Sequence, residues 1–315
     1  MSRSVAVGGA LRRAPLAFPI LLRMRIEAAP LLLLVPTAIS LGSVSVYPIL
    51  DGLWLSFRNT TLATRQDRFV GWLNYRLLAG DPDFWRAWRH TLEFTAISTL
   101  AETAIGLAMA LLLVEWFVGR GLVRAAMLIP WAMPTVVTSK MFGWLFDGQN
   151  GLVNWLLRSL HLISRNIDWY GSPHTALPTI IFADVWKTTP FMALLLLAGL
   201  QTIPGSLLEA ARVDGANAWQ SFWRVRLPML APVLLIAAMF RALDAFRIFD
   251  LVYVLTGGGP ADSTEVLSTL TYKTLFSALE FGYGSALSTA MFATEALMAL
   301  GFGILIVRSM RRQAR

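Results

Sequence analysis

Cysteine is absent from this chain of 315 residues, and charged residues make up only 15 % of it. Without cysteine the chain forms no disulfide, holds no thiolate-ligated metal and uses no thiol nucleophile. The charged fraction is far below the roughly 25 % of soluble domains, and the hydrophobic fraction of 56 % is above their usual value. Together these fractions exclude an ordinary soluble enzyme and favour a protein that crosses a bilayer several times.

Two further absences concern chemistry. The sequence has no G-x-x-x-x-G-K-[ST] phosphate loop and no Gly-Lys dipeptide, so we expect no ATP site of that kind. It has no G-x-S-G motif, and its histidines, His90, His161 and His174, fall at or outside the ends of apolar segments. This argues against an intramembrane serine protease. We therefore expect no catalytic residue, no cofactor and no metal site in this chain.

Six apolar segments are each long enough to cross a bilayer as a helix, which takes about 20 residues. They cover residues 28–50, 91–114, 125–146, 176–200, 229–248 and 285–307. The predicted fold class is an all-α integral membrane protein with six transmembrane helices. Prolines within these segments predict kinked spans.

Basic residues predict the orientation. Of the 27 Lys and Arg residues, 14 lie before the first span, after the last, or in the loops that follow spans two and four. The opposite loops hold nine, mostly in one long loop where the positive-inside rule is weak. Both termini are therefore predicted to be cytoplasmic. The net charge of +8 then reflects topology rather than nucleic-acid binding.

Span five contains charges at steps of three with alternating sign: Arg241, Asp244, Arg247 and Asp250. On one helix such neighbours can pair. Each of them alone near the midplane would cost about 2.5–3.5 kcal/mol, so these residues are expected to face the bundle interior or a polar cavity. They predict an internal watery path, or alternatively an ion-pair ladder that only holds helices together.

Span four repeats this pattern. Asp184 and Lys187 stand three residues apart, followed by Thr188 and by Pro190, which is expected to disrupt the helix. Phe191 comes next, and aromatic rings beside hydroxyls and charges are typical of a sugar site, although packing explains a single ring equally well. The isolated charges in other spans favour interhelical pairs or positions near the membrane edge, with proton transfer as the alternative: Glu93, Glu102, Lys140 and Glu295.

The loop between spans four and five reads as helix, turn, helix. Ser206 and Glu209 have the spacing of a capping box at the start of the first helix. Asp214 and Gly215 are expected to end it, and residues 216–226 can form a second helix. Small side chains in this loop permit close approach of another surface, which predicts a docking element: Ala210, Ala211 and Ala216.

This loop, EAARVDGANAWQSFWRVRLP, resembles the EAA loop of permease subunits of bacterial ABC importers, with EAA, then DGA, then an LP pair. The segments 69–95 and 246–260, the latter reading FRIFDLVYVLTGGGP, are similar to signatures of the carbohydrate branch. The resemblance covers roughly residues 40–307. The combination of VWKTTPFMALLLLAGL with RALDAFRIFD is similar to the first permease subunit of mycobacterial trehalose importers.

The resemblance implies a type I ABC importer permease fold. In this division a basic cytoplasmic segment, residues 1–27, precedes the first span at 28–50 and an extracytoplasmic loop at 51–90. The segment 1–27 can be amphipathic in the headgroup layer or a plain basic tail. A permease core follows at 91–307, with the EAA coupling loop at 201–228 and a cytoplasmic tail at 308–315.

The resemblance also implies partners within a bacterial plasma membrane. These are a second homologous permease subunit, two ABC ATPase subunits that bind ATP and Mg²⁺, and an extracytoplasmic sugar-binding lipoprotein. The implied function is import of a di- or oligosaccharide, trehalose first, by alternating access. Maltose and glycerol phosphate are alternative solutes, and a stand-alone secondary carrier is the alternative mechanism.

By the same resemblance, Glu209 makes a charged contact with the ATPase, and Gly215 permits the turn after Asp214. The three alanines of the loop pack into the ATPase cleft, while capping is the alternative role for Glu209. Five residues are the expected lining of the substrate path: Lys187, Thr188, Phe191, Asp244 and Arg247. Charges stand here where relatives of the maltose type carry Ser or Asn.

Overall fold

The computed structural model describes residues 33–61 and 66–313 of the chain. The chain divides into two compact units, residues 1–52 and residues 53–315. The described part of the first unit is helical: the helix Leu33–Leu55 includes a π-helical stretch, Gly42–Val46, followed by α2, Tyr47–Leu55. The predicted basic segment 1–27 and the first residues of the predicted first span lie outside the described residues.

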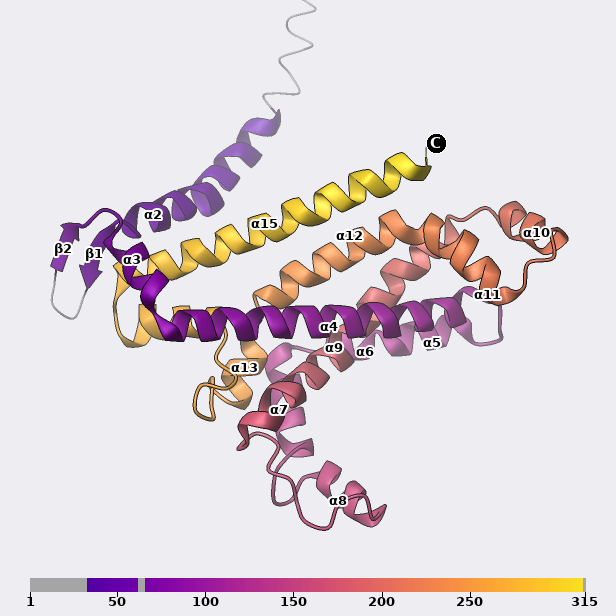
Figure 1. Cartoon of the computed structure of the whole chain (residues 1–315), viewed down its shortest axis with the longest axis horizontal. Coiled ribbons are helices and arrows are strands. Elements are labelled where there is room, and N and C mark those ends of the chain that lie inside the picture. The colour runs from indigo at the N-terminus through magenta and orange to yellow at the C-terminus, as the bar shows by residue number, and fades with distance from the viewer. Residues whose placement is uncertain (1–32, 62–65, 314–315) are drawn as a thin grey trace, which may run out of the picture. The chain divides into compact units, whose positions relative to one another are not determined.

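Long helices dominate the second unit (Figure 1). They are α4 (Pro82–Val114), α9 (Pro173–Gln201), α12 (Leu227–Phe246) and α15 (Phe281–Gln313). Shorter helices connect them: α3 (Leu73–Gly80), α5 (Arg120–Met127), α6 (Ile129–Ala132), α7 (Thr135–Leu145), α8 (Leu152–Ser159), α10 (Gly205–Val213), α11 (Ala218–Ser221), α13 (Asp250–Leu255) and α14 (Leu267–Tyr272). Two further π-helical stretches are Phe222–Arg226 and Lys273–Ser277.

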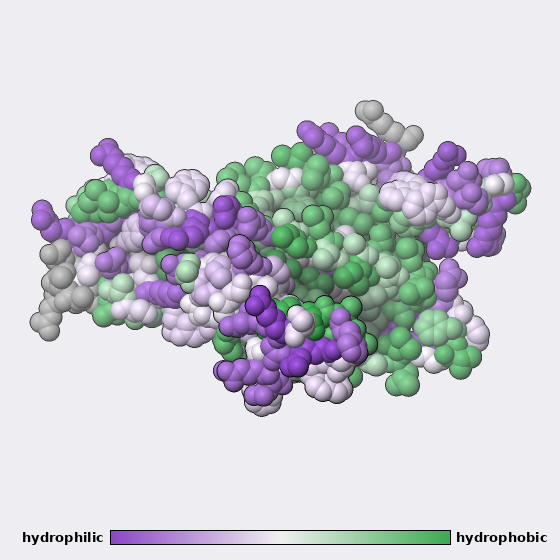
Figure 2. Space-filling view, turned by 60° about the horizontal axis from the view of Figure 1, so that its bottom comes forward, coloured by the Kyte–Doolittle hydropathy of each residue, from purple (hydrophilic) through white to green (hydrophobic). Residues whose placement is uncertain are grey.

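Within the described residues, five helices are long and apolar enough to cross a membrane, or six if one bent pair counts as a span. The fold class predicted from the sequence is therefore confirmed. Figure 2 shows hydrophobic surface gathered over the middle of one face. Hydrophilic surface lies at its two ends and over a segment that projects toward the viewer. This is the pattern expected of a chain with a bilayer around its middle.

The third predicted span is not one straight helix. The segments Arg120–Ala132 and Thr135–Leu145 are bent by 89° at the break between them. Met133, the residue before Pro134, has an extended backbone with ψ of 137°, the conformation that a following proline favours. Pro134 itself has no N–H to continue the ladder. The span predicted at 125–146 is therefore a bent pair of helices, with the break at one of the prolines that predicted a kink.

Within the described residues, proline does not break the spans formed by α9 and α12. Helix α9 continues through Pro178 and Pro190, and α12 continues through Pro232. Before Pro190, the Thr188 hydroxyl donates to the carbonyl of Asp184 at 2.7 Å, and the Thr189 hydroxyl donates to that of Val185 at 2.6 Å. The expected disruption at Pro190 is wrong, because α9 stays helical through this residue while it packs against α4 and α12.

Two glycines bring α4, α9 and α12 close together. A Cβ added to Gly106 would lie 3.0 Å from Cγ of Met192, so α4 and α9 are in direct contact. A Cβ added to Gly199 would lie 2.7 Å from Cγ1 of Val233, which places α9 against α12. In membranes, where lipid is as apolar as a side chain, such small residues allow the backbone approach that holds helices together.

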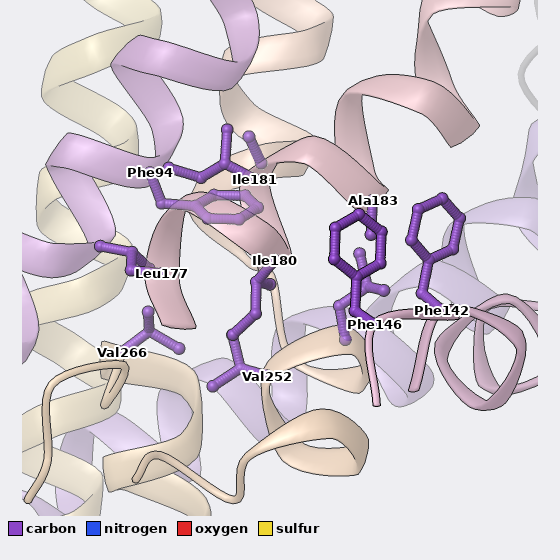
Figure 3. Close-up of a cluster of buried hydrophobic side chains, with 11 residues drawn as sticks. Phe94, Phe142, Phe146, Leu177, Ile180, Ile181, Ala183, Val252 and Val266 are labelled. Carbon is purple, nitrogen blue, oxygen red and sulfur yellow. The ribbon is translucent and has the colours of Figure 1, made fainter. Parts of the chain in front are cut away.

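A buried apolar cluster joins four helices at the end of α9 remote from α10 (Figure 3). Phe94 of α4, Phe142 of α7, Ile180 of α9 and Val252 of α13 contribute to it, and each is at most 3 % exposed. Because α13 is held in this cluster, the chain after α12 turns back into the bundle instead of continuing outward. This turn decides where the charges of span five lie.

The predicted extracytoplasmic loop contains a hairpin of two strands. β1 (Arg58–Thr61) pairs antiparallel with β2 (Gln66–Phe69). Arg58 donates from Nε and Nη2 to the carboxylate of Asp67 at 2.7 and 2.8 Å, and this interaction lowers the pKa of Asp67. Asn74 of α3 donates to the carbonyls of Ser56 and Arg58, both at 2.8 Å. The hairpin is thus anchored to the helical unit.

Gly258 is constrained by its surroundings. Its φ is +96°, and an added Cβ would overlap the buried carboxylate of Glu265, which forms an ion pair with Lys273. We expect Gly258→Ala to destabilise the chain by about 1–3 kcal/mol, because the backbone conformation is strained for alanine. The measurement is the thermal unfolding midpoint of the purified complex in detergent.

Gly259→Ala is the matched control, since its Cβ would lie 3.4 Å from the nearest atom, the carbonyl oxygen of Thr256, an ordinary contact. Equal midpoints for the two variants would contradict the assigned role of Gly258.

Candidate functional site

The loop predicted to lie in the cytoplasm and to couple to an ATPase is built from α10, a turn, α11 and the π-helical stretch that leads into α12. Gly215 makes the turn with φ of +79°, a conformation that glycine adopts without strain. Its N–H donates to the carbonyl of Arg212 at 3.0 Å, and the N–H of Ala216 donates to that of Ala211 at 2.9 Å. The predicted helix, turn, helix arrangement is present.

The cap of this loop differs from the expectation. Helix α10 begins after Pro204 without any side-chain cap, so the capping box expected from Ser206 and Glu209 is wrong. Residue 206 is already inside the first turn, because proline ends the preceding segment. The capping box is formed one helix later by Asn217 and Gln220, whose side chains each accept from the other's backbone N–H at 2.8 and 3.0 Å. Glu209 is thus exposed and has no capping role.

Most residues predicted to contact the ATPase lie on the surface of this loop. Glu209, Ala210, Asp214 and Gly215 are exposed, and Ala211 and Ala216 are half-buried. The sequence interpretation missed two large apolar side chains among them. Val213 is 87 % exposed and Trp219 is 70 % exposed, both on a hydrophilic loop. Large exposed apolar residues of this kind mark protein contact surfaces.

Behind the loop lies a groove of about 740 Å³ between α4 and α11. Leu107 and Leu111 of α4 form one side, and Trp219 and Phe222 the other. Glu115, which follows α4, also lines the groove and forms an ion pair with Arg226 at 3.5 Å. The groove thus lies between the bundle helix α4 and the loop.

A second group of polar residues lies deep in the bundle and surrounds Arg241 of α12. Its guanidinium forms ion pairs with Glu102 of α4 and Asp184 of α9, and pairs with Asp244 through Nη1 at 3.0 Å. The side chains of Glu102, Asp184 and Arg241 are 0 %, 4 % and 5 % exposed. We call these four residues the Arg241 cluster. It links three spans through charges buried together, as charges in a low-dielectric interior require.

The charge ladder expected within span five is only partly present. Arg241 and Asp244 do pair at a spacing of three. Arg247, however, ends α12 and forms an ion pair with Glu295 of α15 at 3.2 Å. Asp250 begins α13 and is not on the same helix. The expected continuous ladder is wrong, because the chain turns between Arg247 and Phe249.

The predicted path residues on α9 are not equally available. Thr188 is buried, and its hydroxyl donates a hydrogen bond to the backbone carbonyl of Asp184. Phe191 stacks on Trp131 of α6, with ring centroids 5.0 Å apart and planes at 9°, so Trp131 covers one of its faces. Lys187 is half-buried and close enough to Asp184 to act on its charge, but the ion pair of Asp184 is with Arg241. Nothing in the sequence indicated a role for Trp131, apart from Pro130 beside it and Pro134 three residues further on.

The isolated charges divide into two kinds. Glu102 and Glu295 make the interhelical pairs expected of them. Glu93 instead pairs with Arg89 on its own helix at 3.4 Å, and Lys140 is exposed. Among residues 33–61 and 66–313, no group of three or more His, Asp or Glu side chains is arranged to hold a metal ion.

Comparison with known proteins identifies the class. The family described as "Binding-protein-dependent transport system inner membrane component" matches residues 102–315. The match contains the coupling loop, the break in span three and both halves of the α9–α12 pair. The chain belongs to this family of membrane permease subunits.

The most informative relatives are permeases with sugar names. The trehalose/maltose transport system permease protein MalF of Thermococcus litoralis is 40 % identical over 84 % of this chain and 87 % of its own length. The trehalose transport system permease protein SugA of Mycobacterium tuberculosis is 42 % identical over 89 % of each chain. The sulfoquinovosyl glycerol transport system permease protein SmoG of Agrobacterium fabrum is 40 % identical over 83 % of this chain and 85 % of its own.

A solved structure supports the fold. A chain of a bacterial ABC transporter that imports the acidic polysaccharide alginate has a TM-score of 0.79 and 21 % identity, covering 92 % of this chain and 99 % of that one. At that identity the likeness concerns the fold alone. It agrees with the type I permease fold expected from the sequence.

Proposed function

We propose that this chain is one of two permease subunits of an ATP-driven importer of a di- or oligosaccharide, with trehalose as the first candidate. The observation that carries the proposal is the identity of 40–42 % with permeases named for trehalose or trehalose/maltose, over most of each chain. The exposed coupling loop supports the need for an ATPase partner, because the sequence has no phosphate loop of its own.

The proposed assembly contains a second homologous permease, two ATPases that bind ATP and Mg²⁺, and an extracytoplasmic sugar-binding lipoprotein. In its support, an alginate transporter has been solved in complex with a periplasmic protein carrying alginate, and one of its chains matches this one with a TM-score of 0.73. Both termini of this chain are proposed to be cytoplasmic, on the same side as α10 and α11, because arginines are concentrated there.

The proposed mechanism is alternating access. Closure of the ATPases moves the coupling loop through Glu209 and the apolar side chains beside it. Helix α9 ends at this loop and α12 begins after it. Both helices move with the loop and open the path to the outside. The loaded binding protein releases its sugar there, and ATP hydrolysis reverses the movement. Direction arises because each ligand binds the two conformations with different free energy.

A second candidate solute is anionic, because SmoG carries the name of a sulfonated sugar derivative. Maltose and glycerol phosphate remain alternatives of the same assembly, and a stand-alone carrier is the alternative mechanism. We place trehalose first because two named relatives share it.

The test is uptake by proteoliposomes that contain the complete complex, with the binding protein outside and ATP inside. We expect trehalose uptake that requires ATP and both ATPases. Competition by maltose and by glycerol phosphate ranks the solutes. Uptake that continues without ATP or without the ATPases would contradict the proposal and favour a secondary carrier.

A further inference from the structure

One carboxylate of the Arg241 cluster faces outward while the other two are buried. The side chains of Glu102 and Asp184 are 0 % and 4 % exposed, whereas that of Asp244 is 71 % exposed. Arg241 carries one positive charge, which is shared among its contacts with all three carboxylates. The charge of Asp244 is therefore not cancelled by its contact with Arg241.

The position of Asp244 restricts what it can face. It lies on the membrane-spanning helix Ala218–Phe246, one turn beyond Arg241. An exposed carboxylate in contact with lipid chains is costly, and charges within spans face a partner or a polar cavity instead. In the proposed assembly that cavity is the sugar path, whose other wall is the second permease subunit.

Arg241 fixes the direction of this carboxylate. Its Nη1 donates to Oδ2 of Asp244 at 3.0 Å, while its other nitrogens are held by Glu102 and Asp184. The guanidinium is planar and cannot lose its proton, so the three contacts define its orientation. Asp244 is thus a hydrogen-bond acceptor presented by a buried support, rather than a side chain free to rotate.

The cations nearest to Asp244 along its own and the neighbouring helix have carboxylate partners of their own. Arg247 is 61 % exposed but forms an ion pair with Glu295 of α15. Lys187 is close enough to Asp184 to attract its negative charge.

We propose that Asp244, held by Arg241, is a specificity-determining residue that admits neutral sugars and excludes anionic ones. This inference rests on the proposed function and names the substrate class within it. A carboxylate accepts strong hydrogen bonds from sugar hydroxyls, but it repels a carboxylate, sulfonate or phosphate on the solute.

The test compares two solutes that differ by one charge, trehalose and its 6-carboxylate analogue. Both are presented to the complete reconstituted complex at concentrations that saturate the binding protein, which a separate binding measurement establishes. We expect the wild type to import trehalose at least about tenfold faster than the analogue. In Asp244→Asn the ratio of the two rates falls about five- to tenfold, the size of one partly screened charge interaction.

Two variants serve as controls. Asp250→Asn makes the same change at an exposed carboxylate that starts α13, outside the Arg241 cluster, and should keep the wild-type ratio. Asp244→Glu keeps the charge and should keep most of the discrimination. Raising the salt concentration should reduce the wild-type ratio, because screening weakens charge repulsion but leaves shape recognition intact.

The outcomes separate the inference from the proposed function. No ATP-dependent trehalose uptake by the wild type would contradict the proposed function itself. Trehalose uptake with an unchanged ratio in Asp244→Asn, or with equal uptake of both solutes by the wild type, would overturn the inference alone. Because Asp244 is mostly exposed and Arg241 keeps its two buried partners, the asparagine variant is expected to fold.

Discussion

Replacing Arg241 with methionine is expected to remove most of the folded chain from the membrane. The change leaves Glu102 and Asp184 buried without their cation, and breaking a buried ion pair in this way costs about 3–5 kcal/mol. That is a large part of the stability of a typical protein. The measurement is the amount of chain that co-purifies with the second permease, together with its thermal unfolding midpoint.

A compensated variant distinguishes charge from shape. Adding Glu102→Gln and Asp184→Asn to Arg241→Met removes all three buried charges at nearly constant volume, and such neutral replacements are often well tolerated. We expect it to recover much of the yield. Arg247→Met is the single-site control, because Arg247 is 61 % exposed and should have a much smaller effect. Wild-type yield and midpoint for Arg241→Met alone would show that the cluster does not hold the three spans.

Removing the charge of Glu209 is expected to disconnect ATP hydrolysis from transport. In Glu209→Gln, sugar uptake and the stimulation of ATP hydrolysis by the loaded binding protein should fall about tenfold, since a hydrogen bond to a charged group contributes roughly 1.5–3 kcal/mol. Glu209 is exposed and does not cap α10, so the variant should leave the chain folded. Both rates are measured on the same preparation of reconstituted complex.

Glu115→Gln is the matched control for this experiment. Glu115 is also an exposed carboxylate at the same end of the bundle as the loop, but it lies just beyond α4 and pairs with Arg226 within the chain. Its change should leave coupling close to that of the wild type. If Glu209→Gln transports and hydrolyses ATP normally, the charged contact with the ATPase does not exist.

Local patterns predicted the parts of the chain that depend on neighbouring residues. Apolar runs of sufficient length located the spans, and the EAA spacing located the coupling loop. The turn at Gly215 followed from its residue type, because few other residues adopt a positive φ without strain. The pairing of Arg241 with Asp244 followed from a spacing of three on a helix.

Contacts between distant segments were beyond such patterns. Arg241 meets Glu102, 139 residues away, and Asp184, 57 residues away, and nothing in the local sequence identifies these partners. The same limit explains the error at Asp250, since its position depends on the packing of α13 against α7 and α9. Prolines were ambiguous for a related reason: Pro134 breaks its span and Pro190 does not, and the difference lies in the helices packed around each.

The exposed Val213 and Trp219 have a consequence for how the cell handles this subunit. In the proposed assembly an ATPase covers these side chains, so a chain made without that partner leaves them exposed on its surface. Uncovered apolar groups of this kind attract chaperones and proteases and promote aggregation. We therefore expect a lower steady-state amount of this subunit in cells that lack its proposed ATPase partner.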